Sequence, residues 1–295
     1  MMEPSDRWQR VAWVPTPEAT DDQGNRIAGG GMPICIHVSA GEWLVFVTAR
    51  DERSRGNVLM CTMDGDESPL HIVRDWKVVM QPGLPGAFDE SGVVASDARL
   101  TSEGIEMLFH GYRLRNGGGW WNAIGRALLS PTGEMRSRTS APVIGLSDEC
   151  PISVAYGSWD PADQDAIWFN SAQGFDLKTS LPERYIVCRS LGGEIDARVT
   201  SVPDGTFALS RPIVMRRNGQ PRLLCSVRGD EYLIVDSPLA NAFEPGVDFE
   251  AFMPAGTGGE VNATAYPYVV RGIDHEVILY NGDRYGATGF GVAVG

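Results

Sequence analysis

Residues 259–295 read GEVNATAYPYVVRGIDHEVILYNGDRYGATGFGVAVG, and polar turns divide this stretch into three short apolar segments. Short apolar runs bounded by Gly, Asn and Asp are typical of β-strands, so we predict strands over residues 266–270, 277–280 and 289–294. The first of these strands carries a proline, Pro267, at its second position. The stretch is therefore a three-strand unit, with a tight turn after its first strand and a polar loop after its second.

The same three-strand unit recurs four times in the preceding sequence. We predict first strands over residues 32–36, 97–100, 150–154 and 211–215. Second strands are predicted over residues 43–50, 106–113, 166–173 and 222–229, and third strands over residues 58–66, 123–134, 185–194 and 232–241. A repeat of roughly 50–65 residues built from short strands is typical of a β-propeller with one repeat in each blade. The sequence therefore predicts an all-β fold, a five-bladed β-propeller.

The N-terminal segment is predicted to close the ring of blades. A candidate fourth strand follows each of the first four units, whereas the chain stops at Gly295 directly after the fifth. An open ring would leave two unpaired strand edges, which proteins usually avoid. Residues 7–14 alternate like a strand, so we predict that they form the outer strand of the last blade, with residues 21–31 as a flexible passage into the first. The whole chain, residues 1–295, is then predicted to be one domain. Residues 1–31 supply the closing strand and the lead-in, and the five blades begin near residues 32, 90, 147, 208 and 260.

Composition argues against several classes of partner. The formal net charge of −13 would repel phosphate backbones, so we predict no nucleic-acid partner. The N-terminus lacks the apolar region of a signal peptide, and no apolar run approaches the ~18 residues of a membrane span, so we predict a cytoplasmic protein without a membrane partner. The five cysteines lie mostly within strand patterns and are predicted to be buried, reduced thiols. The four histidines show no metal-ligand spacing, so we predict no metal and no cofactor, and the sequence leaves the oligomeric state open.

The predicted functional residues gather at one mouth of the propeller. The first strand of each blade starts at this mouth and the antiparallel second strand returns to it, so the starts of first strands and the ends of second strands share a face. The candidates for proton transfer on this face are Asp89, Asp97, Glu149 and His110. The candidates for substrate binding are Arg50, Asp51, Trp120, Arg211, Arg228, Glu260, Tyr266, Asn281, Asp283 and Tyr285.

Several of these candidates have both a functional and a structural interpretation. Asp89 is either a catalytic or substrate-orienting carboxylate or the cap of a turn. Glu149, next to Cys150 and Pro151, is interpreted as a proton donor whose pKa is raised in a semi-apolar pocket. Arg211 and Arg228 suit a carboxylate or phosphate ligand, and otherwise would form salt bridges between blades. Trp120 offers a flat surface for a sugar ring or packs against the protein, and the sequence leaves these alternatives open.

Several short motifs follow one another blade by blade. They are Arg50-Asp51, Phe88-Asp89 with Gly92-Val93, Ser210-Arg211-Pro212, Tyr266-Pro267, and the C-terminal Tyr280-Asn281-Gly282, Tyr285-Gly286 and Gly289-Phe290-Gly291. In these motifs the chain resembles the arabinanase–levansucrase–invertase superfamily of five-bladed, glycosyl-hydrolase-like propellers, and especially an uncharacterised bacterial subgroup of it. Glu260 stands near a glutamate that precedes the Tyr-Pro pair in that subgroup. The resemblance covers residues from about 32 to 295, and its C-terminal motif is the most specific part.

The resemblance implies sugar chemistry, but not ordinary glycoside hydrolysis. In the superfamily, carboxylates on the first strands of blades one to three carry the acid–base steps, and Asp97 and Glu149 are similar in position to the second and third. Residues 31–35, on the first strand of blade one, include no acidic residue, although hydrolysis needs two opposed carboxylates about 5–10 Å apart. We therefore expect an enzyme of polysaccharide or specialised-metabolite biosynthesis that acts on a sugar or sugar-like small molecule. The alternatives are a glycosidase with an atypical base, such as Asp51, and a non-catalytic carbohydrate-binding propeller.

Overall fold

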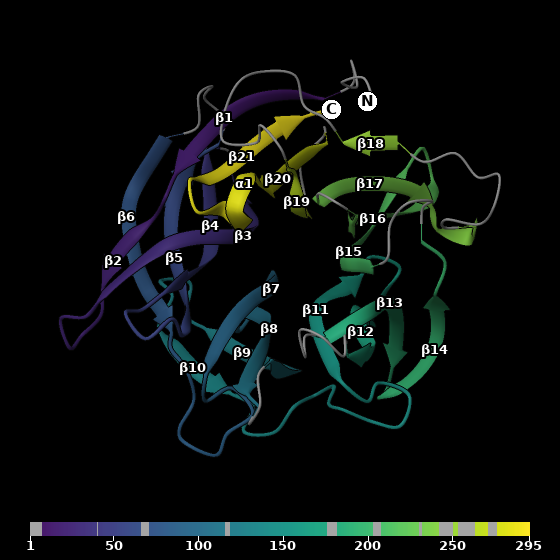
Figure 1. Cartoon of the computed structure of the whole chain (residues 1–295). Coiled ribbons are helices and arrows are strands. Elements are labelled where there is room, and N and C mark those ends of the chain that lie inside the picture. The colour runs from purple at the N-terminus through teal and green to yellow at the C-terminus, as the bar shows by residue number, and fades with distance from the viewer. Residues whose placement is uncertain are drawn as a thin grey trace.

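The computed structural model describes residues 8–39, 41–65, 71–115, 119–175, 182–202, 208–229, 232–241, 250–252, 263–270 and 276–295. In these ranges the chain is built from β-strands, with one helical turn (η1, Leu239–Asn241) and one short helix (α1, Asp283–Gly286). Figure 1 shows the strands in five groups around a common centre, with β3, β7, β11, β15 and β19 nearest to it.

Each group is a meander of consecutive strands. The first group comprises β2 (Glu18–Thr20), β3 (Arg26–Ser39), β4 (Glu42–Arg50), β5 (Gly56–Asp64) and β6 (His71–Met80). The second comprises β7 (Gly92–Thr101), β8 (Gly104–Leu114), β9 (Trp120–Leu129) and β10 (Met135–Arg138). The third comprises β11 (Ser153–Asp160), β12 (Asp163–Phe175), β13 (Pro182–Leu191) and β14 (Glu194–Val199). The fourth comprises β15 (Ala208–Arg217), β16 (Gln220–Arg228), β17 (Tyr232–Pro238) and β18 (Glu250–Phe252). The fifth comprises β19 (Ala265–Val269), β20 (Val277–Asn281) and β21 (Gly289–Val294), and β1 (Gln9–Pro15) pairs with it.

Neighbouring strands within a group are antiparallel. The first two groups are joined into one sheet by a single parallel pair between Gly56 of β5 and Gly92 of β7. The other three groups are separate four-stranded sheets, and the order in the fifth is β1-β21-β20-β19. This arrangement confirms the predicted all-β fold and the predicted meander of each unit.

The N-terminal strand pairs as the alternation in the sequence predicted. Gln9 to Pro15 run antiparallel to β21, with Val14 opposite Phe290. The indole Nε1 of Trp13 donates to the carbonyl of Thr288 at 3.1 Å. The first strand of the chain and the last strand of the chain are therefore neighbours in one sheet.

Burial follows the position of each strand within its group. In β4, seven consecutive residues from Trp43 to Ala49 are buried, because the strand is covered on both faces by neighbouring groups. In the outer strand β14, by contrast, exposed and half-buried residues alternate, as expected where one face meets solvent. The five cysteines are buried and unpaired, which confirms the expectation from the strand patterns. No helix in the described ranges is long and apolar enough to cross a membrane.

The structure differs from the sequence prediction at several boundaries and in one loop, and three of these differences have a clear local reason. Residues 21–31 are not a flexible passage throughout, because β3 begins at Arg26 and pairs with β2 and β4. The polar loop after β20 contains the helical turn α1. The first strand of the third unit begins at Ser153 rather than Cys150, since the proline used to align this unit, Pro151, precedes the strand.

Candidate functional site

A β-bulge interrupts the innermost strand of every group. The bulges lie between Gly31 and Ile34, Ala95 and Asp97, Ala155 and Ser158, Ser210 and Ile213, and Ala265 and Tyr268. In four of the five groups the bulge holds a residue other than glycine in the left-handed region, with φ between 50° and 57°: Met32, Tyr156, Arg211 and Tyr266. Such a conformation costs about 1–3 kcal/mol per residue and is concentrated at functional sites. We call these four the bulge residues.

A buried polar side chain on the second strand of each group lies at the level of the bulge. These anchor residues are Thr48, His110, Asn170, Ser226 and Asn281. Three of them reach a bulge residue in the next group of the ring and accept a hydrogen bond from its backbone N–H, which would otherwise be buried without a partner. The acceptors are Asn281 Oδ1 for Met32 at 2.8 Å, Ser226 Oγ for Tyr266 at 2.6 Å and His110 Nδ1 for Tyr156 at 3.4 Å.

Tyrosines from three groups meet above these bulges. The rings of Tyr156 and Tyr266 lie 5.5 Å apart, and those of Tyr266 and Tyr232 lie 5.9 Å apart. The imidazole of His110 meets Tyr156 edge-on at 4.6 Å, and the guanidinium of Arg228 lies 5.7 Å from the ring centre of Tyr232. Tyr156, Tyr232 and Tyr266 form the tyrosine cluster. Tyr156 and Tyr232 are half-buried, so the cluster offers aromatic surface on which a sugar ring can stack.

Arg211 lies within this cluster and has no exposed surface. Its Nη2 donates to the carbonyl of Pro33 at 2.9 Å, whereas its Nε and Nη1 find no hydrogen-bond partner among the described residues. Burial lowers the pKa of Arg211 to about 10, against the opposing influence of Tyr156, Tyr268 and Asp97. The guanidinium therefore stays charged at neutral pH, with two of its nitrogens unused.

Asp97 joins three groups instead of facing the mouth with a free carboxylate. It is fully buried, and its Oδ1 accepts hydrogen bonds from the N–H of Ala98 at 2.8 Å and from the hydroxyl of Tyr268 at 2.9 Å. Its Oδ2 accepts a hydrogen bond from the N–H of Trp159 at 2.9 Å. The predicted proton-transfer residue is thus committed to three donors from β7, β11 and β19, which is the geometry of a structural tie.

His110 is held in its neutral form. Burial, and secondarily the charge of Arg211, lower the pKa of His110 to about 3. Its Nδ1 faces the N–H of Tyr156 and, at 3.4 Å, the hydroxyl of Ser96. Because Nδ1 accepts the N–H of Tyr156, the proton of the neutral imidazole lies on Nε2. Of the four residues predicted to transfer protons, His110 is the one that contacts the tyrosine cluster, through Tyr156.

Acidification is expected to destabilise the protein in part through His110. The pKa of His110 is about 3 in the folded state and about 6.5 in an unfolded chain, so between these values only the unfolded state gains the proton. The stabilising effect is complete above pH 6.5 and is lost toward pH 3, by up to about 1.4 kcal/mol per pH unit. Urea unfolding at pH 7 and pH 5 of the wild type and of His110→Asn checks this, since asparagine occupies the same position in two other groups. Equal pH dependence in both proteins would contradict it.

Asp89 belongs to the loop that leads into β7, and its contacts are with this loop and with the strands of the second group. Its side chain is 2% exposed and its Oδ2 lies 3.4 Å from Nη1 of Arg138 on the outer strand β10. Burial raises the pKa of Asp89, and Arg138 opposes this rise. Gly111 of β8 lies so close that a Cβ there would be 2.2 Å from the Cβ of Asp89. The contacts describe a buried strut between the loop and two strands of the second group.

Glu149 and Asp51 are engaged in local contacts. Glu149 lies before β11, its side chain is 54% exposed, and it forms a salt bridge with Arg198 of the outer strand β14. The expected semi-apolar pocket around Glu149 is therefore wrong. The carboxylate of Asp51 accepts hydrogen bonds from the N–H groups of Arg53 and Arg55 and from Nε of Arg55, and so organises the turn after β4. Both carboxylates are therefore already engaged by neighbouring side chains or backbone N–H groups.

The remaining predicted binding residues divide between the rim and the interior. Arg50 is exposed and donates to the carbonyl of Ser54 and to the hydroxyl of Tyr112. Trp120 is 37% exposed at the start of β9, on the same mouth. Asp283, the first residue of α1, accepts a hydrogen bond from the N–H of Ala263 at 2.9 Å. Glu260 lies outside the described residues, as does the side chain of Tyr285.

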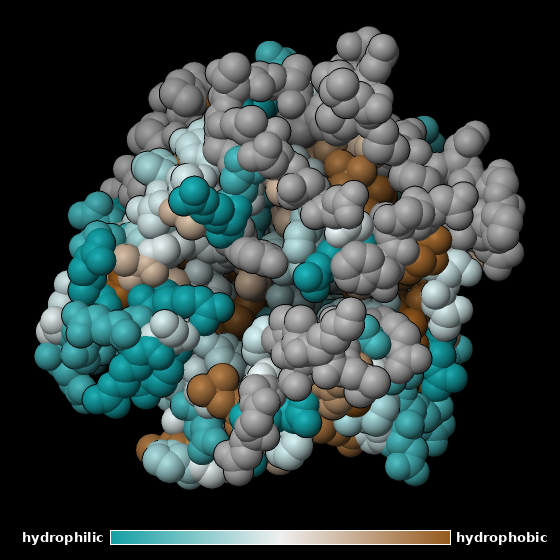
Figure 2. All heavy atoms as spheres, viewed as in Figure 1, coloured by the Kyte–Doolittle hydropathy of each residue, from teal (hydrophilic) through white to brown (hydrophobic). Residues whose placement is uncertain are grey.

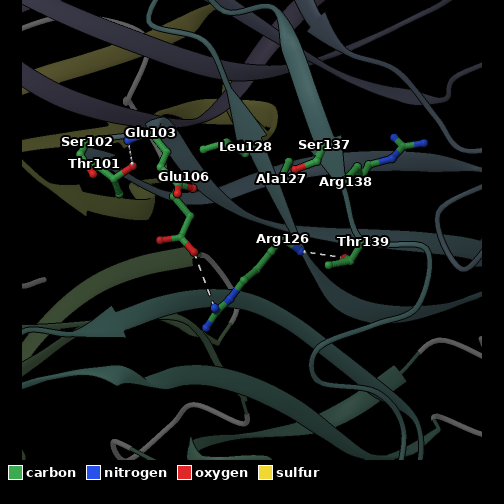
Figure 3. Close-up of a pocket in the computed structure, with 10 residues that line it drawn as sticks. All are labelled: Thr101, Ser102, Glu103, Glu106, Arg126, Ala127, Leu128, Ser137, Arg138 and Thr139. Carbon is green, nitrogen blue, oxygen red and sulfur yellow. Dashed lines mark hydrogen bonds and ion pairs between the residues drawn. The ribbon is translucent and has the colours of Figure 1, made fainter.

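Figure 2, viewed onto the mouth that carries α1, shows a hollow near the centre of this face in which hydrophobic and weakly polar atoms are visible, with hydrophilic side chains farther out. A separate cavity of about 520 Å³ opens beside the turn between β7 and β8, at the other end of the strands (Figure 3). Three of its charged residues are in ion pairs, since Glu106 lies 2.6 Å from Arg99 and 3.6 Å from Arg126, and Arg138 lies 3.4 Å from Asp89. Arg126 Nε is the one unsatisfied buried side-chain atom among the described residues that line this cavity, whereas Arg211 at the tyrosine cluster has two, so we favour the tyrosine cluster as the functional site. Among the residues with a described placement, no group of three or more His, Cys, Asp or Glu is positioned to hold a metal.

Sequence reasoning placed Asn170 on the functional mouth but missed Tyr156 and Tyr232 as site residues. A signal for the bulge residues was present, because Met32, Arg211 and Tyr266 each directly precede a proline in their strands. In the third group the equivalent pair is Tyr156-Gly157, so alignment on prolines passed over it. The anchor residues carry no common side chain, and only their place opposite the bulge reveals them.

Comparison with known proteins agrees with this fold. No protein-family model matches the chain. The chain is 24% identical over 299 residues to the uncharacterized protein Rv1502 of Mycobacterium tuberculosis (strain ATCC 25618 / H37Rv), covering 97% of this chain and 98% of that protein. Among solved structures it is similar to an alpha-L-arabinofuranosidase of Podospora anserina in complex with cellotriose, with a TM-score of 0.61, 12% identity and coverage of 98% and 96% of the two chains. It is also similar to a sucrose-6-phosphate hydrolase of Lactobacillus gasseri, with a TM-score of 0.60, 9% identity and coverage of 90% and 58%. The chain therefore has the β-propeller fold that these glycoside hydrolases share.

Proposed function

We propose that this chain is a five-bladed β-propeller, closed by β1, that binds a sugar or sugar-like small molecule at the tyrosine cluster. The pairing of β1 with β21 supports closure of the ring. The main observation in support of this binding site is that Tyr156, Tyr232 and Tyr266, from three different groups, lie together beside strained bulges. The similarity in fold to an arabinofuranosidase solved with cellotriose and to a sucrose-6-phosphate hydrolase supports a sugar as the ligand.

The chemistry of the site favours a mechanism other than the paired-carboxylate route. That route needs two opposed carboxylates about 5–10 Å apart, one of which donates a proton. Asp97 is tied to three donors, Glu149 is exposed and paired, and Asp89 faces Arg138. The groups at the cluster that carry a transferable proton are the Nε2–H of the neutral imidazole of His110, whose Nδ1 is occupied by the N–H of Tyr156, and the tyrosine hydroxyls. We infer an enzyme that acts on its sugar through these groups, while a place in polysaccharide or specialised-metabolite biosynthesis stays a prediction.

The second candidate function is a non-catalytic carbohydrate-binding propeller. Its support is the same tyrosine cluster, because a stacking surface serves binding without any proton transfer. A measurement of sugar turnover distinguishes the two candidates, because only the enzyme converts its ligand. His110→Asn should abolish turnover in the enzyme and leave binding intact in either case, since asparagine, as at Asn281, keeps an acceptor for the N–H of the bulge residue.

Removal of one ring from the cluster tests the site directly. Tyr156→Ala is expected to weaken binding of neutral oligosaccharides about tenfold, because stacking on the half-buried ring is lost. Isothermal titration with a panel that includes cellotriose and arabino-oligosaccharides measures this. The control is Trp76→Ala, which removes a partly buried aromatic ring from the outer strand β6 and should leave affinity unchanged. An absence of binding to any sugar, or equal affinity of wild type and Tyr156→Ala, would overturn the proposal. Release of the aglycone from aryl glycosides would instead favour a glycosidase with an atypical base.

A further inference from the structure

Two anchor residues lack a hydrogen-bond partner among the described residues, Thr48 and Asn170, and only Asn170 faces a bulge that holds a left-handed residue. At three of the four bulge residues, an anchor residue of the preceding group accepts a hydrogen bond from the buried backbone N–H. By the same order, the anchor residue for the bulge at Arg211 is Asn170 of β12, and β12 contacts β15. Both amide atoms of Asn170, Oδ1 and Nδ2, are buried without a hydrogen-bond partner among the described residues. The bulge at Arg211 is thus the one at which a left-handed residue and an unsatisfied anchor coincide.

The unsatisfied groups at this bulge are of complementary kinds. Nε and Nη1 of Arg211 and Nδ2 of Asn170 are donors, and Oδ1 of Asn170 is an acceptor. A buried polar atom without a partner is costly, and a buried charge with unused donors is more so. Structures retain such groups where a ligand or ordered water completes them. Three donors beside one acceptor suit an anionic group that carries a neighbouring hydroxyl.

We propose that Asn170 and Arg211 bind the acidic group, a carboxylate or a phosphate, of an acidic sugar whose ring stacks on the tyrosine cluster. This inference rests on the proposed function and names the class of its ligand. The fork of a guanidinium matches carboxylate and phosphate oxygens in pairs, which a single ammonium does not. The acceptor Oδ1 of Asn170 takes the hydroxyl beside the acidic group.

Access to this position runs past Tyr156. Arg211 is fully buried, whereas Tyr156, which interacts with it electrostatically, is half-buried and reaches the surface of the mouth. Binding of the acidic group therefore involves a shift of the Tyr156 ring within the cluster, where the ring still offers a face to the sugar. Arg228, half-buried beside Tyr232, adds a second positive charge at the mouth and attracts the same anion.

Matched pairs of sugars test the inference with the full chain. D-glucuronate against D-glucose and D-galacturonate against D-galactose differ only at C6, where the acid replaces a hydroxymethyl group. Titration calorimetry is expected to show each acid binding at least tenfold more tightly than its neutral partner. Glucose 6-phosphate, tested beside glucuronate, distinguishes a phosphate ligand from a carboxylate ligand. Binding of inorganic phosphate as strong as that of every sugar acid would indicate an adventitious ion only and would overturn the inference.

Two substitutions separate ligand binding from structural support. Arg211→Met and Asn170→Leu are each expected to abolish the preference for the acid. Asn170→Leu should leave the midpoint of urea unfolding equal or higher, because two unsatisfied polar atoms are removed. Arg211→Met also removes the donor to the carbonyl of Pro33, so the stability measurement is made on Asn170→Leu. The matched control is Asn281→Leu, at the same position of the repeat, which should lower the midpoint because the N–H of Met32 loses its acceptor. Arg216→Met, an exposed arginine farther along β15, should leave the preference unchanged. If Arg211→Met does not fold, Arg211→Lys retains a charge without the fork and should lose most of the preference.

The outcomes distinguish this inference from the proposed function. Tight binding of neutral sugars with no preference for the acids would overturn the inference and leave the proposed function standing. Retention of the preference in both Arg211→Met and Asn170→Leu would do the same. Binding of no sugar, acidic or neutral, would overturn the proposed function itself.

Discussion

Asp97→Asn is expected to destabilise the fold by about 2–5 kcal/mol, a large share of the stability of an ordinary domain. The carboxylate accepts hydrogen bonds from the N–H groups of Ala98 and Trp159 and from the hydroxyl of Tyr268. Asparagine offers one acceptor oxygen and a donating NH₂ group in place of two acceptor oxygens. At least one of the three donors would then face another donor in a fully buried position, which costs the desolvation of both.

Urea unfolding of Asp97→Asn, with Asp148→Asn as control, measures the effect. Asp148 is an exposed aspartate in the loop before β11, and its substitution should change the free energy of unfolding by less than about 0.5 kcal/mol. The experiment also decides between two interpretations of Asp97. A variant that unfolds like the wild type but has lost turnover would make Asp97 a catalytic group, against the structural role that its three hydrogen bonds indicate.

The fold was predictable from the sequence because each repeat unit is recognisable from residues that are close together in the chain. Apolar runs, tight turns and polar loops recur in each unit, so strand positions such as 289–294 agree with the structure residue by residue. The pairing of β1 followed from a count of strands and from the cost of an open edge. These features depend on neighbours in sequence or on one general rule, and neither requires knowledge of side-chain contacts.

The candidate site was predictable only in outline. The arginine of Ser210-Arg211-Pro212 and the tyrosine of Tyr266-Pro267 were identified, and the structure brings both to the centre. The roles assigned to carboxylates were not predictable, because the hydrogen bonds of Asp97 come from strands 62 and 171 residues away. Glu149 illustrates the converse problem. Its neighbours in sequence, Cys150 and Pro151, suggested an apolar pocket, whereas its side chain points to solvent and to Arg198.

The bulge residues show why a repeat is more informative than a single motif. A left-handed arginine, or a buried asparagine without a partner, has no distinctive signature in sequence. Once the groups are superposed by their bulges, Asn170 and Asn281 become equivalent, and only one of them has its hydrogen bond. The proposal of a ligand at Asn170 rests on this difference in hydrogen bonding between equivalent positions, and not on the residue types alone. The same logic assigns Asp97 to the framework, since it is satisfied throughout.

Deletion of residues 1–15 is expected to destabilise the protein by several kcal/mol and to promote aggregation, because it removes β1 from β21 and exposes a strand edge. The loss also includes packing. The ring of Trp8 lies 5.2 Å from that of Phe252, and Val14 is 3% exposed opposite Phe290. Thermal unfolding and size-exclusion chromatography of the shortened chain measure both effects.

A matched pair of point variants on β1 separates pairing of the strand from mere chain length. Val14→Asp places a carboxylate in a buried position without a partner and should lower stability by about 2 kcal/mol or more. Gln9→Asp introduces the same charge at an exposed position of the same strand and should have little effect. If the shortened chain melts like the full chain, or if the two aspartate variants are equally stable, β1 does not close the ring. The fifth group would then be complete without it, and its unpaired edge at β21 would require another cover.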